Sequence, residues 1–171
     1  LSLFWFLYSL LYSLILSFDD GYRDFYTDAF PILQKYKVKS VAFIISGFIN
    51  FPNHMTDEQL NRIAKSGVVE IGAHTIHHLA LNGLSKEKIQ QEVEGSKVQL
   101  EQKLGIPVTT FAYPYGSFDL NAIQIAKQAG FRTALSTIPG SQVNNPVRLL
   151  AYRLRPGAST GQNLLNLVQK N

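Results

Sequence analysis

Two adjacent aspartates and a cluster of histidines are the residues of this sequence best suited to chemistry. Asp19 and Asp20 end an apolar run in "LILSFDDGYRD", and three of the four histidines lie within five positions in "HTIHH". The spacing of His74 and His78 can put two imidazoles on one helical face, where they could chelate a metal ion. His74 with His77 would serve nearly as well by spacing alone.

Two imidazoles need at least one further protein ligand to hold zinc in an open catalytic site, and a carboxylate would complete the set. Asp19 or Asp20 can supply it. Neighbouring side chains on a strand or tight turn point to different sides, so one aspartate can bind the metal while the other faces an activated water. The free carboxylate would then accept a proton from that water as a general base.

The rest of the sequence must position these groups. Short apolar runs predict strands, and segments with helical periodicity or caps predict helices between them. The predicted strands are residues 14–18, 40–46, 68–73, 109–113, 133–136 and 148–154, and the predicted helices are 24–37, 57–66, 85–104, 119–130 and 160–168. This alternation indicates an α/β fold, either an open doubly wound sheet or a barrel.

The polar clusters of the chain each follow a predicted strand. They are the aspartate pair, the histidines of 74–78, and the segment 113–116. In both candidate architectures the C-terminal ends of the strands converge on one face, where active sites lie. We therefore expect three clusters from distant parts of the sequence to meet.

These motifs together resemble the polysaccharide deacetylases, carbohydrate esterase family 4, with their NodB-homology domain. "SFDDGYRD" is similar to the family's T-F-D-D-G, "HTIHH" to its H-[ST]-x-x-H, and "FAYPYGSFD" to its R-x-x-Y-G region. The resemblance implies a distorted, TIM-like (β/α) barrel of about seven strands in a single domain. That domain would cover residues 14–171, preceded by an apolar segment at 1–13.

The resemblance also assigns roles at the candidate site. It implies that Asp19 is the general base and that Asp20, His74 and His78 bind a divalent metal, which leaves His77 as a non-ligand. Zinc is the expected ion, and Co²⁺, Ni²⁺ or Mn²⁺ would fit the same donors.

Two further segments take roles from the same resemblance. Thr75 would steady the histidine loop through its hydroxyl, and the backbone N–H of Tyr115 would stabilise the oxyanion of the tetrahedral intermediate. Pro114 and Gly116 would shape the loop that faces the substrate.

The sequence departs from the family pattern where charge and a general acid are expected. Ala112 stands where the motif often has an arginine, and we hypothesise that Arg153 or Arg155 supplies the charge instead. The acidic, tryptophan-containing fourth motif is not recognisable. No histidine follows His78, and His54 could approach the site only if its loop folds over it. The proton for the leaving group would then come from the general base itself or from water.

Composition narrows the partners. The 171 residues carry a net charge of +4 without a basic run, so no nucleic-acid partner is expected, and the absence of cysteine excludes thiolate metal sites. Residues 1–13 are uncharged and rich in leucine and aromatics; they either pack before the first strand or are the remnant of an export signal or membrane anchor. We expect a secreted or cell-surface monomer, with membrane contact only through this segment.

The combined expectation is a metal-dependent hydrolase that removes acetyl groups from N-acetylglucosamine units of a cell-wall or extracellular polysaccharide. An acetyl-ester esterase of the xylan type could use the same site. A non-catalytic glycan-binding domain is the alternative from a different class, because the motif arginine and the late histidine are missing.

Overall fold

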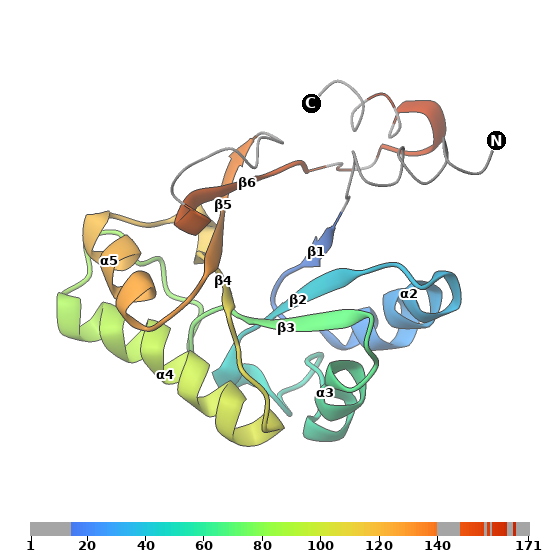
Figure 1. Cartoon of the computed structure of the whole chain (residues 1–171), viewed down its shortest axis with the longest axis horizontal. Helices are drawn as coiled ribbons and strands as arrows, with labels where there is room; N and C mark the ends of the chain where they lie inside the picture. The colour runs from blue at the N-terminus through green and yellow to red at the C-terminus, as the bar shows by residue number, and fades with distance from the viewer. Residues whose placement is uncertain (1–14, 140–147, 156, 158, 164–165, 167–171) are drawn as a thin grey trace, which may run out of the picture.

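Six parallel strands in consecutive order form the sheet of this protein (Figure 1). The computed structural model describes residues 15–139, 148–155, 157, 159–163 and 166. The strands are β1 (Leu16–Phe18), β2 (Ser40–Ile44), β3 (Val69–Ala73), β4 (Thr110–Ala112), β5 (Thr133–Pro139) and β6 (Ala151–Arg153). The sheet curls into a half-barrel with the helices outside it, which confirms the predicted (β/α) barrel class. Six strands lie in the described residues, where about seven were expected.

The helices fill the connections between the strands. They are α2 (Phe30–Tyr36), preceded by the π-helical turn η1 (Phe25–Ala29), α3 (Asp57–Ala64), α4 (Lys86–Leu104) and α5 (Leu120–Gln128). Short 3₁₀ turns follow β2 at η2 (Ser46–Phe48) and β4 at η3 (Pro114–Gly116), and a third precedes β6 at η4 (Arg148–Leu150). Both turns that follow strands lie at C-terminal strand ends, where the candidate site was expected.

Local capping signals explain where several helices begin and end. Thr56 and Gln59 form the predicted capping box of α3. Ser85 caps α4 by accepting a hydrogen bond from the Lys88 N–H, and Gly105 ends that helix in a left-handed conformation. These signals act within a few residues, so the sequence shows them directly.

The two faces of the sheet have different packing. Ala42 and Ile44 of β2 belong to the main hydrophobic core, which also holds buried side chains from all four α-helices. The alternate residues Val41 and Phe43 form a smaller cluster with Ala112 on the opposite face. This follows the two-residue period of a strand. The face of the sheet opposite the main core therefore carries a small apolar cluster of its own.

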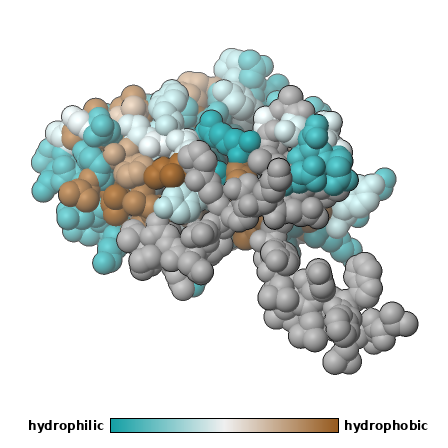
Figure 2. Space-filling model, turned by 90° about the horizontal axis from the view of Figure 1, so that it is seen from above, coloured by the Kyte–Doolittle hydropathy of each residue, from teal (hydrophilic) through white to brown (hydrophobic). Residues whose placement is uncertain are grey.

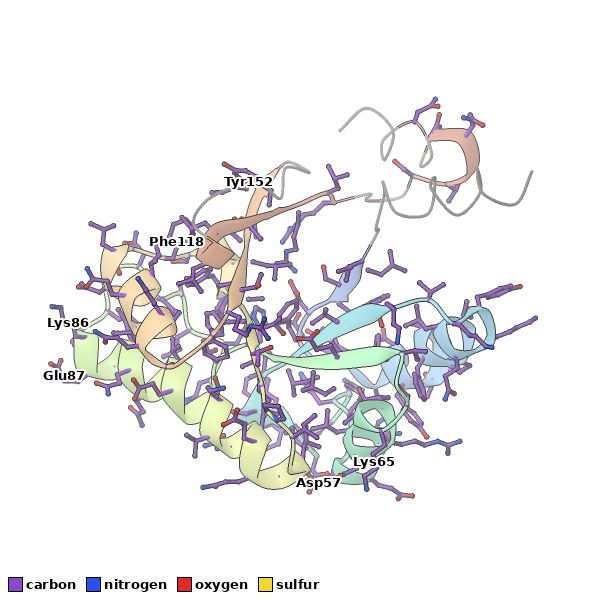
Figure 3. The ribbon with its side chains drawn as sticks, in the orientation of Figure 1. Asp57, Lys65, Lys86, Glu87, Phe118 and Tyr152 are labelled. Carbon is purple, nitrogen blue, oxygen red and sulfur yellow. The ribbon has the colours of Figure 1, made fainter. Side chains whose placement is uncertain are left out.

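Ion pairs and hydrogen bonds tie the helices to each other at the surface. Asp57, labelled in Figure 3 at the start of α3, lies 2.6 Å from Lys103 Nζ in the last turn of α4. Its other carboxylate oxygen accepts a hydrogen bond from the Asn50 side chain at 2.9 Å. The loop before α3 is therefore fastened to the helix that follows it and, through that helix, to α4.

The sequence predictions fail or stay untested near the two chain ends. The first three residues of the predicted strand 148–154 form the 3₁₀ turn η4, and the strand begins only at Ala151. The predicted helix 160–168 lies partly outside the described residues, and the apolar segment 1–13 lies wholly outside them. Among the helices that the structure describes, none has both the length and the apolar character needed to cross a membrane. Seen from above, the described surface is mostly hydrophilic, and apolar residues gather mainly on the side of α5 (Figure 2).

Gly72 in β3 allows the strands to pack closely below the candidate site. A Cβ atom at this position would lie 2.4 Å from the Phe43 ring and 2.9 Å from Thr110 Oγ1. We predict that Gly72→Ala lowers the free energy of unfolding by about 1–3 kcal/mol, since overpacking forces neighbouring side chains and backbone to move. Urea denaturation followed by circular dichroism measures the loss.

Glu70→Ala is the matched control, because Glu70 lies two residues earlier in the same strand and is exposed. A change of at most about 0.5 kcal/mol is expected for that surface substitution. Equal stability of Gly72→Ala and the wild type would show that the contact with Phe43 does not require a glycine.

Candidate active site

The described structure brings the sequence-predicted site residues to the C-terminal ends of their strands. Asp19 and Asp20 come directly after β1, and His74 directly after β3. Tyr115 lies in η3 just beyond β4, and Arg153 is the last residue of β6. Strand ends that are far apart in the sequence therefore supply one site, as expected for this architecture.

Asp20, His74 and His78 form a cluster with the dimensions of a metal site. Asp20 Oδ1 lies 3.4 Å from His74 Nε2 and 3.3 Å from His78 Nε2. Ligand atoms on a tetrahedral zinc ion, bound at about 2.0–2.1 Å, are separated by about 3.4 Å. Asp20 Oδ1 is also buried without a hydrogen-bond partner. A buried carboxylate oxygen that faces two imidazole nitrogens at these distances fits a divalent cation.

His74 is fixed in the tautomer that a metal ligand needs. Its Nδ1 donates a hydrogen bond of 2.7 Å to the carbonyl oxygen of Ala112, which can only accept. In the neutral ring, Nε2 is then left with a lone pair directed toward Asp20. The side chain is 2% exposed, so β4 orients this imidazole in the interior.

His78 reaches the cluster because of the conformation of its loop. Thr75 and His78 both have left-handed backbones, with φ of 65° and 57°. The His78 N–H donates to Thr75 Oγ1 at 2.9 Å, so the hydroxyl steadies the loop as predicted. Burial, and then the nearby His74, lower the pKa of His78 below its ordinary value, so the ring is neutral and able to bind a cation near pH 7.

Asp20 and Asp19 leave the strand in different directions. Asp20 has φ of 72° and Gly21 has φ of 74°, so the chain turns sharply through two left-handed residues immediately after Asp19. Strained backbone of this kind is typical of functional sites, where surrounding structure stabilises it.

His77, which spacing alone left as an alternative ligand, points away from the cluster. Its Nδ1 lies 2.7 Å from Glu92 Oε1, and its side chain is 52% exposed. Glu92 is a fully buried residue of α4. Its other oxygen accepts the backbone N–H groups of Ile76 and His77 at 3.1 and 2.8 Å. One carboxylate thus fixes both the loop and the orientation of the histidine that the site does not use.

Sequence reasoning missed Glu92. A signal was present, because Glu92 occurs between Ile89 and Val93 on the face of α4 that is buried against the core. A carboxylate on the apolar side of a helix is rarely buried without a partner. Burial raises the pKa of Glu92, but hydrogen bonds from His77 and Lys88 outweigh that effect and lower the pKa below its ordinary value.

Arg153 supplies the charge partner that the sequence analysis hypothesised for Asp19. Its Nη1 lies 2.6 Å from Asp19 Oδ1, and its Nε donates to the carbonyl oxygen of Ser136 at 3.0 Å. Arg155, the alternative, is exposed and lines a cavity of about 210 Å³ beside Asp19. The ion pair joins β6 to the end of β1, the two outermost strands of the sheet.

The loop after β4 places Tyr115 against His78. The rings of Tyr115 and His78 have centroids 4.5 Å apart, and Tyr115 is 68% exposed. Gly116 has φ of 65°, and a Cβ atom there would lie 2.0 Å from Thr137 Oγ1, so only glycine fits. Pro114 is buried below. The oxyanion role of the Tyr115 N–H stays a prediction.

The fold and the site together define a (β/α) barrel with an Asp-His-His cluster that could hold a metal ion and a second aspartate beside it. Residues 12–134 match the polysaccharide deacetylase family. The chain therefore belongs to that family, as its motifs predicted.

Relatives and solved structures agree with this assignment. The chain is 35% identical over 143 residues to YxkH of Bacillus subtilis, which is named as a polysaccharide deacetylase, covering 82% of this chain and 51% of YxkH. It is 31% identical over 131 residues to the poly-β-1,6-N-acetyl-D-glucosamine N-deacetylase of Staphylococcus aureus, covering 69% of this chain and 45% of the enzyme. The chain thus spans about half the length of these curated relatives.

A solved structure has the same fold. The deacetylase PplD of Streptococcus pyogenes, in complex with acetate, superposes with a TM-score of 0.81 at 29% identity. The match covers 90% of this chain and 69% of PplD.

The two neighbouring histidines provide a direct test of the metal site. We predict that the protein binds a divalent metal and that His78→Ala weakens zinc binding. The loss should be at least about 10–100-fold, because removing a residue that merely supports a metal ligand already has an effect of that size. His77→Ala should keep the metal, because His77 faces Glu92. Zinc titration with a competing chelator measures both variants, and equal loss in both would contradict the ligand assignment.

Glu92 gives a second test, of the support for the histidine loop. We predict that Glu92→Gln lowers the free energy of unfolding by about 1–3 kcal/mol, because an amide cannot accept all the hydrogen bonds that the buried carboxylate accepts. Glu94→Gln is the control, since Glu94 is on the same helix and its carboxylate accepts a hydrogen bond from the Gln90 side chain in place of the histidine loop. Urea unfolding measures the difference.

The pH dependence follows from the lowered pKa of Glu92. A carboxyl whose folded pKa is lowered stabilises the fold above its ordinary pKa of 4.5, and this stabilisation is lost as pH falls through the folded value. The stability gap between wild type and Glu92→Gln should therefore shrink below pH 4.5. A gap that widens on acidification would contradict the role of the carboxylate.

Proposed function

We propose that this protein is a metal-dependent N-deacetylase that acts on N-acetylglucosamine units of a cell-wall or extracellular polysaccharide. The observation that carries the proposal is Asp19, a second carboxylate that Arg153 holds beside the Asp20, His74 and His78 cluster. A binding site for a metal alone would not need it. The named activity of the Staphylococcus aureus relative supports the substrate class.

Asp20, His74 and His78 are the residues that would hold the metal. When bound, a divalent ion would supply Lewis acidity, which polarises the acetyl carbonyl and makes water acidic enough to act as a nucleophile near neutral pH. Two imidazoles and a carboxylate suit zinc, and Co²⁺, Ni²⁺ and Mn²⁺ accept the same donors.

Asp19 would carry the proton transfers. Its carboxylate takes a proton from water as the water oxygen attacks the acetyl carbon, and the proton then passes to the amide nitrogen as the C–N bond breaks. The products are acetate and the free amine of the sugar. The hydrogen bond from Arg153 leaves one carboxylate oxygen of Asp19 occupied and fixes the direction of the other.

The loop after β4 would stabilise the transition state. In this proposal the Tyr115 backbone N–H faces the oxyanion, while Pro114 and Gly116 keep the loop in place. A preorganised donor of this kind costs no reorganisation when the charge develops.

We also propose that the protein works outside the cell or at its surface, where such polymers occur. The uncharged, apolar composition of residues 1–13 supports an exported or membrane-attached protein.

The central prediction concerns Asp19. Asp19→Asn should lower acetate release from oligomers of N-acetylglucosamine by about 10²–10⁴-fold, the usual contribution of a general base. Its zinc affinity should stay unchanged, because Asp19 lies outside the Asp20, His74 and His78 cluster. A coupled acetate assay and metal analysis of the same preparation measure the two quantities.

Asp24→Asn is the control, since Asp24 is exposed and follows the same strand. Acetate release by Asp19→Asn at the wild-type rate would remove the proposed mechanism. Faster release from O-acetylated xylan than from N-acetylated oligomers would instead assign the site to an esterase.

A further inference from the structure

Four aromatic side chains form a connected cluster beside the aspartate loop. The rings of Phe48 and Phe51 stack with centroids 5.6 Å apart and an angle of 11°. His54 contacts Phe48 edge-on at 5.2 Å and lies against Tyr22 at 4.9 Å. We call Tyr22, Phe48, Phe51 and His54 the aromatic ledge.

The ledge leaves much of its apolar surface in solvent. Phe51 is 54% exposed and Tyr22 is 45% exposed. Scattered apolar residues on a surface need no explanation, but a contiguous group of rings is typical of binding sites. These rings belong to one group, because His54 connects Tyr22 to Phe48 and Phe51.

The backbone holds the ledge rigidly. Tyr22 and His54 pair as an isolated antiparallel bridge, the Arg23 N–H donates to the Asn53 carbonyl at 2.7 Å, and the Met55 N–H donates to that of Gly21 at 3.0 Å. Met55 itself is buried at 2% exposure. A surface that is already ordered loses little conformational entropy when a ligand binds.

The ledge lies at the same end of the sheet as the Asp20, His74 and His78 cluster. Tyr22 is two residues from Asp20, and Phe48 ends η2 at the C-terminal end of β2, the same end of the sheet as the site. The loop that carries His54 folds onto the aspartate segment. By sequence alone, the approach of His54 to the site was conditional on such folding.

We propose that the aromatic ledge binds a pyranose ring of the polymer next to the sugar whose acetyl group is removed. A pyranose has an apolar face of C–H groups that packs on aromatic rings, and its hydroxyls can bond with the Tyr22 hydroxyl and the His54 ring. This inference rests on the proposed function. It implies that the protein acts on chains of sugars in preference to single sugars.

Kinetics on two substrates test the ledge. Phe51→Ala and Tyr22→Ala should each raise KM for an N-acetylglucosamine oligomer by about three- to tenfold, the scale of one aromatic contact. kcat should change little, and activity on the monosaccharide should stay at the wild-type level. Circular dichroism and zinc content establish that the variants are folded and can bind metal.

Tyr36→Ala is the matched control. Tyr36 is 65% exposed, but it ends α2 shortly before β2 begins, at the opposite end of the strand from the site. The inference is overturned if Phe51→Ala changes KM for the oligomer no more than Tyr36→Ala does while the wild type releases acetate. In that case the proposed function still stands.

Two further measurements separate the remaining outcomes. If the wild type releases no acetate, the proposed function fails. Titration of the protein with the oligomer, followed by NMR, still tests the ledge in that case. Chemical-shift changes at Tyr22, Phe51 and His54 support the inference, and their absence overturns it. If Phe51→Ala weakens sedimentation with vesicles of equal parts phosphatidylethanolamine and phosphatidylglycerol and leaves KM unchanged, the ledge contacts membranes and the sugar site is excluded.

Discussion

The convergence of three electron-rich atoms is the constraint on which the rest of the site depends. Asp20 Oδ1 lies 3.4 and 3.3 Å from the Nε2 atoms of His74 and His78. Without a cation, a carboxylate oxygen and two nitrogen lone pairs gain little from this proximity, and Asp20 Oδ1 has no hydrogen-bond partner. The fold must therefore hold these atoms together, and left-handed backbone at Asp20, Thr75 and His78 is part of that cost.

The support for this arrangement comes from the neighbouring elements. The Ala112 carbonyl of β4 orients His74, and Glu92 of α4 holds the far side of the histidine loop. The loop after β2 also pairs with the histidine loop, because the Gly47 N–H donates to the Ile76 carbonyl at 3.1 Å. β4 thus orients His74, while α4 and the loop after β2 hold the histidine loop from two sides.

The ion pair between Asp19 and Arg153 connects the candidate site with the curvature of the sheet. β1 and β6 are the outermost strands of the sheet, and their C-terminal residues meet only because the sheet curls. The charge that the family motif places near position 112 is supplied here from residue 153, on another strand. A guanidinium can thus reach the Asp19 carboxylate from another strand of the half-barrel than the one on which the family motif places its arginine.

Features that depend on neighbouring residues could be predicted from the sequence. The caps at Thr56, Ser85 and Gly105, the buried strands, and the order of the aspartate and histidine motifs follow from local chemistry. Spacing alone left His77 and His78 equivalent, and the family resemblance assigned His78 as the ligand. The tertiary structure turns His77 toward Glu92, introduces Glu92 itself, and pairs Arg153 instead of Arg155 with Asp19. Those choices depend on contacts between residues far apart in the chain, whose directions are set by strand curl and loop conformation and not by spacing.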